Sequence, residues 1–283
     1  VADNCSPEMT EFLLQQFGLE QEDLYRVNGP VNLGRLVQIP DSVDRPELKF
    51  PVFVQGLPSE ITKANDIFAS IRKGDILLHH PFQSFAPVVE FIQQAASDPH
   101  VVAIKQTVYR AGRASDLIEA LIAASARGKE VTVVVELLAR FDEEANINWA
   151  DKLEHEGAQV VYGVFGLKTH AKLALILRRE ATANGSHRLV PYAHLGTGNY
   201  HPRTARLYTD FGLLTADPDL CHDVNEVFLH ITSLAKAARM RRLLLAPFTG
   251  AWVDRWNLRR ALIVSDTLRA AGVLSIPALY AWS

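Results

Sequence analysis

Buried strand runs alternate with helical segments along most of this chain. The runs "DILLHHP", "VVAIKQTVYR", "VTVVVELLAR" and "AQVVYGV" are rich in β-branched and other apolar residues, and an amphipathic segment lies in each interval between them. Strands that are apolar on both faces are typical of sheets covered by helices on both sides. The alternation therefore predicts an α/β layer fold with a mostly parallel sheet between residues 57 and 242.

The segments on either side of this domain do not continue its pattern. Residues 1–56 look like an incomplete module, with a helix capped by Ser6 and a proline-rich stretch at 44–60 that marks a boundary. Residues 243–283 form a divergent tail in which 251–272 carries an amphipathic helical pattern. We expect three parts: 1–56, 57–242 and 243–283.

Composition excludes several classes of protein. The net charge of -3 argues against a generally basic nucleic-acid binder, although a local cationic pocket remains compatible with it. The two cysteines, Cys5 and Cys221, form no disulfide framework and fit a reducing compartment. No run reaches the roughly 18 to 20 apolar residues that a spanning helix needs. We expect a cytoplasmic protein with no transmembrane segment and no nucleic-acid partner.

Two strand runs end on an arginine directly before a helical segment. Arg110 closes "VVAIKQTVYR" and Arg140 closes "VTVVVELLAR". In an open parallel sheet both would lie at the carboxyl edge, where such folds bind ligands. The planar guanidinium suits phosphate oxygens. The competing interpretation is a surface arginine paired with a nearby acid such as Asp142.

The stretch "GLKTHAKLALIL" begins an apolar run with alternating cations. Few residues separate it from the preceding strand, so we expect it to return antiparallel and to start at the same edge. Lys168, His170 and Lys172 would then share one face. Such a cluster repels itself unless an anion occupies it. A histidine among fixed cations can attack phosphorus, whereas a hydrogen-bonded strand-end histidine is the alternative for His170 taken alone.

Three further patterns are less specific. Gly196 and Gly198 in "YAHLGTGNYH" would let backbone amides approach an anion, although an ordinary turn explains them equally well. Arg206 and Tyr208 share a face if "ARLYTDFGLL" is extended. The adjacent histidines at 79 and 80 should point to opposite faces, which argues against a metal pair. The chain has no P-loop, protein-kinase motif set or metal-binding cysteine cluster.

Taken together, six ordered motifs resemble those of bacterial polyphosphate kinases of the large, histidine-phosphorylated type. They are "LLHHPFQSF", "AIKQTVYRAG", "VTVVVELLARFDEEANINWA", "GLKTHAKL", "YAHLGTGNYH" and "ARLYTDFGLLTAD", and the resemblance covers about residues 8–249. It implies a phosphotransferase that moves the terminal phosphate of ATP reversibly to polyphosphate through a phosphohistidine. It also implies a phospholipase-D-like, layered mixed sheet flanked by helices, the first of two such domains in the family. Residues 1–56 would then be the remnant of a preceding helical domain and its linker.

The resemblance assigns roles to individual residues. His170 matches the phosphorylated histidine and Lys172 its catalytic neighbour, while Tyr208 matches a nucleotide-contacting tyrosine. Arg110 and Arg140 match the arginines that line the magnesium-phosphate site, with Mg²⁺ arriving with ATP. The candidate phosphate contacts are Lys168, Lys105, His194 and Arg206.

Family members continue beyond position 249 into a second domain that supplies another catalytic histidine. We therefore expect this chain to be an incomplete portion with weak or no kinase activity, from an enzyme that is homo-oligomeric when complete; peripheral membrane association is left open. Two alternatives stand beside this interpretation. One is a phospholipase-D-like phosphodiesterase, which usually needs two H-x-K units, and the other is a non-catalytic fragment that binds polyphosphate.

Overall fold

The computed structural model describes residues 1–51, 53–62, 66–109, 115–136, 143–163, 169–182, 184–233 and 240–243. The chain divides into two compact units, Val1–Val54 and Gln55–Ser283. The predicted limits at 57 and 242 stay predictions. The helix predicted for 251–272 lies outside the described residues.

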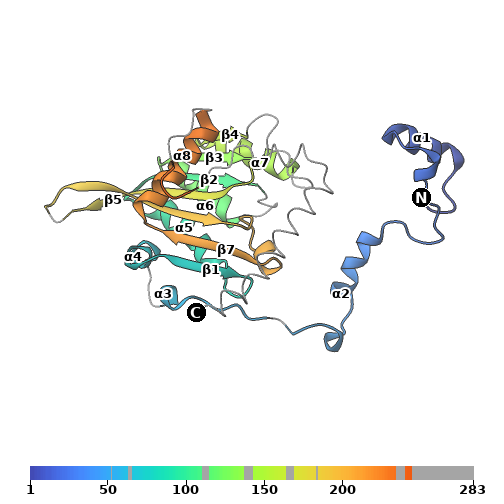
Figure 1. Ribbon diagram of the computed structural model, residues 1–283, viewed down its shortest axis with the longest axis horizontal. Helices are drawn as coiled ribbons and strands as arrows, with labels where there is room; N and C mark the ends of the chain where they lie inside the picture. The colour runs from blue at the N-terminus through green and yellow to red at the C-terminus, as the bar shows by residue number, and fades with distance from the viewer. Residues whose placement is uncertain are drawn as a thin grey trace, which may run out of the picture. The chain divides into compact units, whose positions relative to one another are not determined.

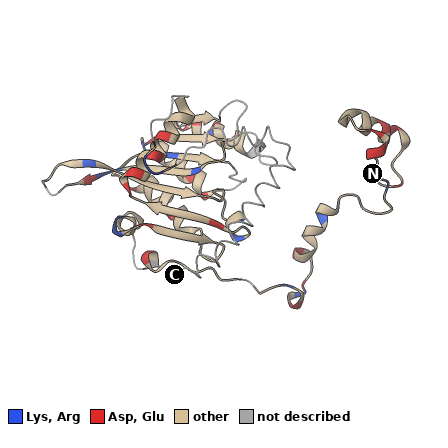
Figure 2. Cartoon of the chain, in the orientation of Figure 1, with Lys and Arg blue, Asp and Glu red and all other residues tan. Residues whose placement is uncertain are grey.

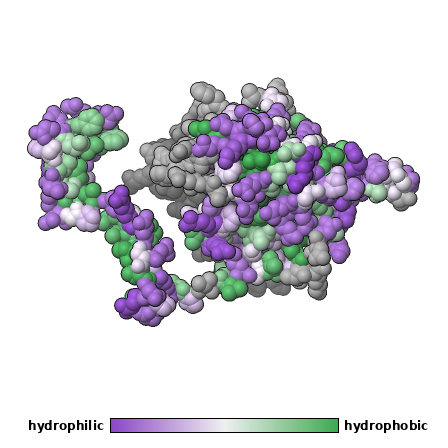
Figure 3. Space-filling model, turned by 180° about the vertical axis from the view of Figure 1, so that it is seen from behind, coloured by the Kyte–Doolittle hydropathy of each residue, from purple (hydrophilic) through white to green (hydrophobic). Residues whose placement is uncertain are grey.

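The first unit is built from short helical pieces. Helix α1 (Pro7–Phe17) begins where the Ser6 hydroxyl accepts a hydrogen bond from the Met9 amide, which confirms the predicted cap, and it ends at Gly18 in the left-handed conformation. The short pieces that follow are η1 (Gln21–Asp23), η2 (Leu33–Gln38), α2 (Ile39–Ser42) and η3 (Pro46–Leu48). Among the described residues of the first unit, Thr10 has the one buried side chain. Apolar side chains appear at the surface of this unit (Figure 3).

The second unit contains a seven-stranded mixed sheet of order β1-β7-β6-β5-β2-β3-β4 (Figure 1). The strands are β1 (Ile76–His80), β2 (Val101–Val108), β3 (Glu130–Val135), β4 (Gln159–Tyr162), β5 (Lys172–Ala181), β6 (His187–Gly196) and β7 (Asp210–Thr215). Strands β2, β3 and β4 pair in parallel. Every other pairing is antiparallel, including that of β5 with β2, which confirms the predicted return. The predicted layered mixed sheet is confirmed, whereas a mostly parallel sheet is wrong.

Helices cover the two faces of this sheet unequally. The larger hydrophobic core joins one face to α4 (Ile67–Lys73), α5 (Ala86–Ser97), α6 (Asp116–Ala126) and α7 (Glu143–His155), with the single-turn helix α3 (Ser59–Thr62) beside α4. The smaller core joins the other face, at β5 and β6, to α8 (Pro218–Ser233). Acidic and basic residues are interspersed along the described elements (Figure 2), in keeping with the small net charge.

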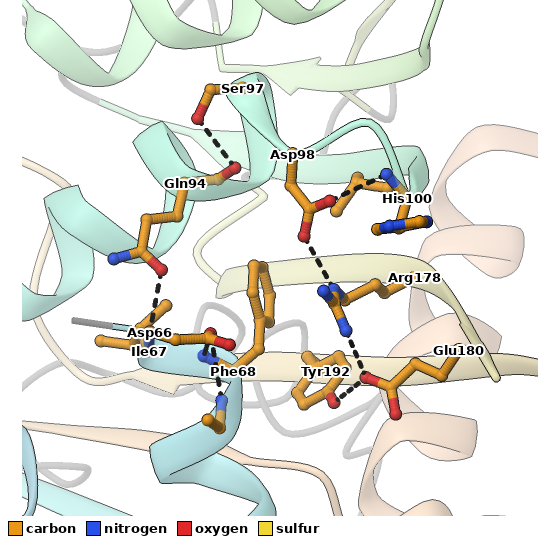
Figure 4. A network of polar contacts seen from close by, with 12 residues as sticks. Asp66, Ile67, Phe68, Gln94, Ser97, Asp98, His100, Arg178, Glu180 and Tyr192 are labelled. Atoms are coloured by element: carbon orange, nitrogen blue, oxygen red, sulfur yellow. Dashed lines mark hydrogen bonds and ion pairs between the residues drawn. The ribbon is translucent and has the colours of Figure 1, made fainter. Parts of the chain in front are cut away.

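A half-buried ion-pair network lies where the long β5–β6 hairpin begins to project beyond the neighbouring strands (Figure 1). Arg178 of β5 donates to Asp98 at 2.7 Å and to Glu180 at 2.9 Å (Figure 4). Glu180 also accepts from Arg72 at 2.8 Å and from the Tyr192 hydroxyl at 2.5 Å. The network therefore ties the hairpin to α4 and to the residue that ends α5.

The strand directions bring one end of each of the seven strands to the same edge of the sheet. Strands β1, β2, β3, β4 and β6 end at this edge, while β5 and β7 begin at it, because their pairing partners run the opposite way. The edge lies at the carboxyl ends of the parallel strands, where the sequence placed the site.

Candidate functional site

A cavity of about 320 Å³ opens at this edge of the sheet. Its walls come from the end of β2, the start of β5, the loop after β6, the turn η4 (Thr204–Arg206) and the start of β7. The lining residues are Tyr109, His170, Lys172, Thr197, Gly198, Asn199, Thr204, Tyr208 and Asp210.

Hydrogen bonds from the ends of β2 and β3 and from α7 fix the backbone segment that carries His170. His170 lies two residues before β5, and its side chain is exposed. The amide of Thr169 donates to the Glu136 carboxylate at 2.7 Å, and Glu136 is itself buried at the end of β3. The side-chain amide of Asn146 in α7 donates to the carbonyls of both Tyr109 and Glu136 at 3.0 Å. Two strand ends and a helix thus fix the backbone beside the histidine.

The Tyr109 ring lies between the two groups that the sequence singled out. It meets the His170 ring edge-on, with 5.7 Å between the ring centroids and an interplanar angle of 73°. The Lys172 ammonium is 5.4 Å from the Tyr109 centroid, within the range of a cation–π interaction. Tyr109 therefore restricts both side chains at once.

Lys172 is a buried cation at the wall of the cavity. Its side chain donates to the His170 carbonyl at 2.6 Å, and the residue is only 4% exposed. Burial lowers the pKa of the Lys172 ammonium to about 8, against the opposing effect of the negative charge on Asp210. An ammonium with this pKa is charged at neutral pH and can release its proton at small cost.

The loop after β6 approaches Asp210 very closely. A Cβ on Gly198 would lie 2.6 Å from Cγ of the Asp210 carboxylate, so only glycine fits this position. The Thr197 hydroxyl donates to Asp210 at 2.8 Å from the same loop. The "GTGN" segment therefore has a packing reason to contain Gly198, and backbone binding of an anion there stays a prediction.

The structure brings together His170, Lys172 and Tyr208, which all line the one cavity. Tyr208 is 63% exposed there and so is accessible to a ligand. Three other predicted cations, Arg110, Arg140 and Lys168, lie outside the described residues.

Three candidate phosphate contacts lie away from the cavity wall. Lys105 is in the interior of β2 and donates to Asn225 of α8 at 3.0 Å. His194 is 2% exposed and lines a smaller, neighbouring cavity. Arg206 is exposed at the end of η4, so the extended arrangement that would pair it with Tyr208 is not formed. The geometry gives none of the three a direct place in the site.

Sequence reasoning missed the residues that support the site. Tyr109, Glu136, Asn146 and Asp210 were not singled out, although two of them left a signal. Glu136 is a lone acid that interrupts the apolar run "VTVVVELL", and Tyr109 directly precedes the arginine of "VYR". Asn146 and Asp210 are ordinary in their local sequence, and only the tertiary fold gives them partners.

The two adjacent histidines point to opposite faces, as predicted. His79 stacks on Phe211 with 4.5 Å between ring centroids, whereas His80 is buried. Within the described ranges, no group of three or more His, Cys, Asp or Glu side chains could hold a metal ion. None of the helices described here is long and apolar enough to cross a membrane.

Comparison with known proteins identifies the family. A family model described as polyphosphate kinase C-terminal domain 1 matches residues 66–237. Polyphosphate kinase of Neisseria meningitidis serogroup C is 56% identical over 249 residues, 88% of this chain and 36% of that protein. Polyphosphate kinase of Burkholderia multivorans is 60% identical over 237 residues, 84% of this chain and 34% of that protein. The crystal structure of polyphosphate kinase from Porphyromonas gingivalis superposes with a TM-score of 0.69 at 32% identity, covering 88% of this chain and 38% of that one.

Fold and site together define an α/β layer protein with a histidine and a lysine in a cavity at its strand ends. The chain belongs to the polyphosphate kinase family. It spans about a third of the length of the curated relatives that it matches.

Proposed function

We propose that His170 is the phosphorylated nucleophile of an ATP:polyphosphate phosphotransferase, and that this chain supplies the part of the enzyme that carries it. The observation that supports this most directly is the shared cavity of His170, Lys172 and Tyr208 in a chain of the polyphosphate kinase family. The proposed substrates are ATP or ADP and inorganic polyphosphate. A cytoplasmic location and a homo-oligomeric complete enzyme belong to the same proposal.

The proposed reaction has two balanced steps. A ring nitrogen of His170 attacks the γ-phosphorus of ATP, the bond from that phosphorus to the bridging oxygen breaks, and ADP leaves with the electron pair. A terminal oxygen of polyphosphate then attacks the phosphohistidine, and the ring nitrogen recovers its electron pair. Reversal of both steps makes ATP from polyphosphate.

Lys172 supplies positive charge where the transferring group gathers negative charge. Its ammonium is held by the His170 carbonyl and the Tyr109 ring, so it needs little reorganisation during transfer.

Asp210 offers the one described carboxylate in the cavity wall, which fits Mg²⁺ arriving on the nucleotide rather than a protein cage of carboxylates. Bound in this way, the ion would neutralise phosphate charge. Arg110 and Arg140 remain proposed linings of the same magnesium-phosphate site.

Labelling with ATP tests the nucleophile. The chain is incubated with Mg²⁺ and ATP labelled in the γ-phosphate, and protein-bound label that is stable in alkali and labile in acid is counted. The expected result is weak label on the unaltered chain, because it spans about a third of the length of its relatives. That label should be lost in His170→Ala and retained in His155→Ala, an exposed histidine at the end of α7. Label that persists in His170→Ala would show that another residue is the nucleophile.

The same assay separates the alternatives. Polyphosphate binding that weakens with salt, without any label, would assign the chain to polyphosphate binding alone, since phosphate contacts of this kind are screened. Hydrolysis of a simple phosphodiester in the absence of ATP would instead assign it to the phosphodiesterases.

A further inference from the structure

A second, much smaller cavity lies behind the wall of the site. Its volume is about 10 Å³, which is room for a single water molecule. Gly198, Asn199 and Asp210 line both cavities, so the loop after β6 and the start of β7 separate them.

Three buried polar atoms on residues that line this small cavity have no hydrogen-bond partner among the described protein atoms. They are Nε2 of His80, Nε2 of His194 and Oδ1 of Asn199. Buried polar atoms are nearly always satisfied in folded proteins, and three on the residues that line one small cavity point to a shared polar occupant.

The hydrogen bond at Nδ1 of each histidine ring determines whether Nε2 of that ring is a donor or an acceptor toward the cavity. Nδ1 of His80 donates to the Gln83 carbonyl at 2.9 Å, because a carbonyl can only accept. In the tautomer with its hydrogen on Nδ1, Nε2 is an acceptor. Nδ1 of His194 lies 2.7 Å from the Tyr200 hydroxyl. Burial lowers the pKa of His194 to about 3 and raises the pKa of Tyr200, so the imidazole is neutral and the phenol keeps its proton.

Only one tautomer of His194 satisfies every group. If the Tyr200 hydroxyl donates to Nδ1, then Nε2 of His194 carries the hydrogen and becomes a donor into the cavity. The cavity then presents one donor, His194, and two acceptors, His80 and Asn199. The opposite tautomer would present three acceptors, and one water has only two hydrogens to give.

We propose that the small cavity binds a single structural water that accepts a hydrogen bond from His194 Nε2–H and donates to His80 Nε2 and Asn199 Oδ1. Three bonds are the usual number for a buried water. The water links β1 and β6 to the loop that forms the wall of the site, so it holds Asn199 in that wall. His194 has its place here as a positioning residue and makes no contact with phosphate.

Gly212 leaves the space that this water needs. A Cβ at this position would lie 2.8 Å from Nε2 of His194, which is a hydrogen-bond distance, and 3.6 Å from Nε2 of His80, which is longer than one. The bridging water would therefore lie beside this point, nearer to His80. A methyl group there would displace the water without removing any of its three partners.

Nuclear magnetic resonance of the whole chain with ¹⁵N-labelled histidine tests the proposal. Long-range ¹H–¹⁵N correlations at pH 7 should show His194 with its hydrogen on Nε2 and His80 with its hydrogen on Nδ1, and the His194 ring should show magnetisation transfer from a long-lived water. A hydrogen on Nδ1 of His194, or no transfer from water, would overturn the proposal.

Gly212→Ala supplies the second measurement, with Gly74→Ala as its control. A Cβ on Gly74 would meet nothing within 4 Å, so that variant should retain the water signal in full. Gly212→Ala should lose it, and a signal of undiminished strength in that variant would contradict the site. If Gly212→Ala does not fold, the tautomers of the unaltered chain decide the question by themselves.

Discussion

At the scale of single residues, the chemistry of the site depends on burial that the sequence does not display. The alternation of Lys168, His170 and Lys172 correctly predicted that His170 and Lys172 meet at one edge. The alternation also predicted equal exposure for the two side chains on one strand face. In the structure, His170 is exposed and precedes β5, whereas Lys172 is buried and belongs to β5. Burial depends on residues far along the chain, such as Tyr109 and Asp210, and local periodicity contains no information about them.

The lowered pKa of Lys172 predicts a specific dependence of stability on pH. The folded value is about 8 and the ordinary value is 10.5, so between these values the unfolded chain binds more protons than the folded one. Stability from this group is therefore reduced below pH 8 and recovers as the pH rises toward 10.5. Relative to Lys172→Met, the unaltered chain should gain about 1–3 kcal/mol of unfolding free energy between pH 7.5 and pH 10.5.

Urea unfolding at the two pH values, with the difference between chain and variant taken at each, measures this effect. Lys152→Met is the control, because Lys152 is exposed on α7 and its substitution should leave the difference constant. A difference for Lys172→Met that does not change with pH would mean that Lys172 titrates as an ordinary lysine.

At the scale of elements, short connections were predictable and distant pairings were not. The few residues between β4 and β5 allow only an antiparallel return, and the structure confirms it. Strand β1 precedes a helix and a strand as in a parallel unit, yet it pairs antiparallel with β7, more than a hundred residues later. Nothing local to β1 specifies that partner, because a pairing between strands this far apart in the sequence depends on the tertiary fold.

The ion-pair network of Arg178, Asp98 and Glu180 on the β5–β6 hairpin should stabilise the fold in a pH-dependent way. Burial raises the pKa values of Asp98 and Glu180, but their hydrogen bonds, including those from Arg178, outweigh it and lower both overall. Groups of this kind contribute stability above their ordinary values near 4 and lose it as the pH falls through the lowered values. Arg178→Met should cost about 1–3 kcal/mol at pH 7, since it removes the guanidinium that Asp98 and Glu180 share and leaves Asp98 without its ion-pair partner.

Thermal or urea unfolding from pH 7 to pH 2.5 follows the loss. The gap between chain and variant should narrow as the pH falls, because protonated carboxyl groups no longer need the guanidinium. Arg188→Met, on the same hairpin and exposed, should change stability little at any pH. An equal cost for the two variants at pH 7 would contradict a role for the network.

At the scale of the whole molecule, the hydrophobic core belongs to the second unit. Every buried apolar side chain in the described ranges comes from position 61 or later. In the first unit, by contrast, Phe50 is 99% exposed and Val37 77%. In the sequence, the alternation of strand and helix patterns starts only beyond about residue 56. The sequence could not indicate how little core the first unit would have, because its helical pattern is amphipathic.

Removing residues 1–54 should therefore leave the sheet unit folded. A chain that begins at Gln55 keeps α3, α4, all seven strands and both cores. Its melting temperature in calorimetry should lie within about 4 °C of that of the full chain, the shift expected for roughly 1 kcal/mol in a unit of this size. A chain that begins at Gly74 is the matched control, because it also lacks the buried Phe68 and Ile71 of α4 and should melt far lower or fail to fold. A drop of the same size for both truncations would show that the sheet unit depends on the first 54 residues for its stability, and the core would then not be self-contained.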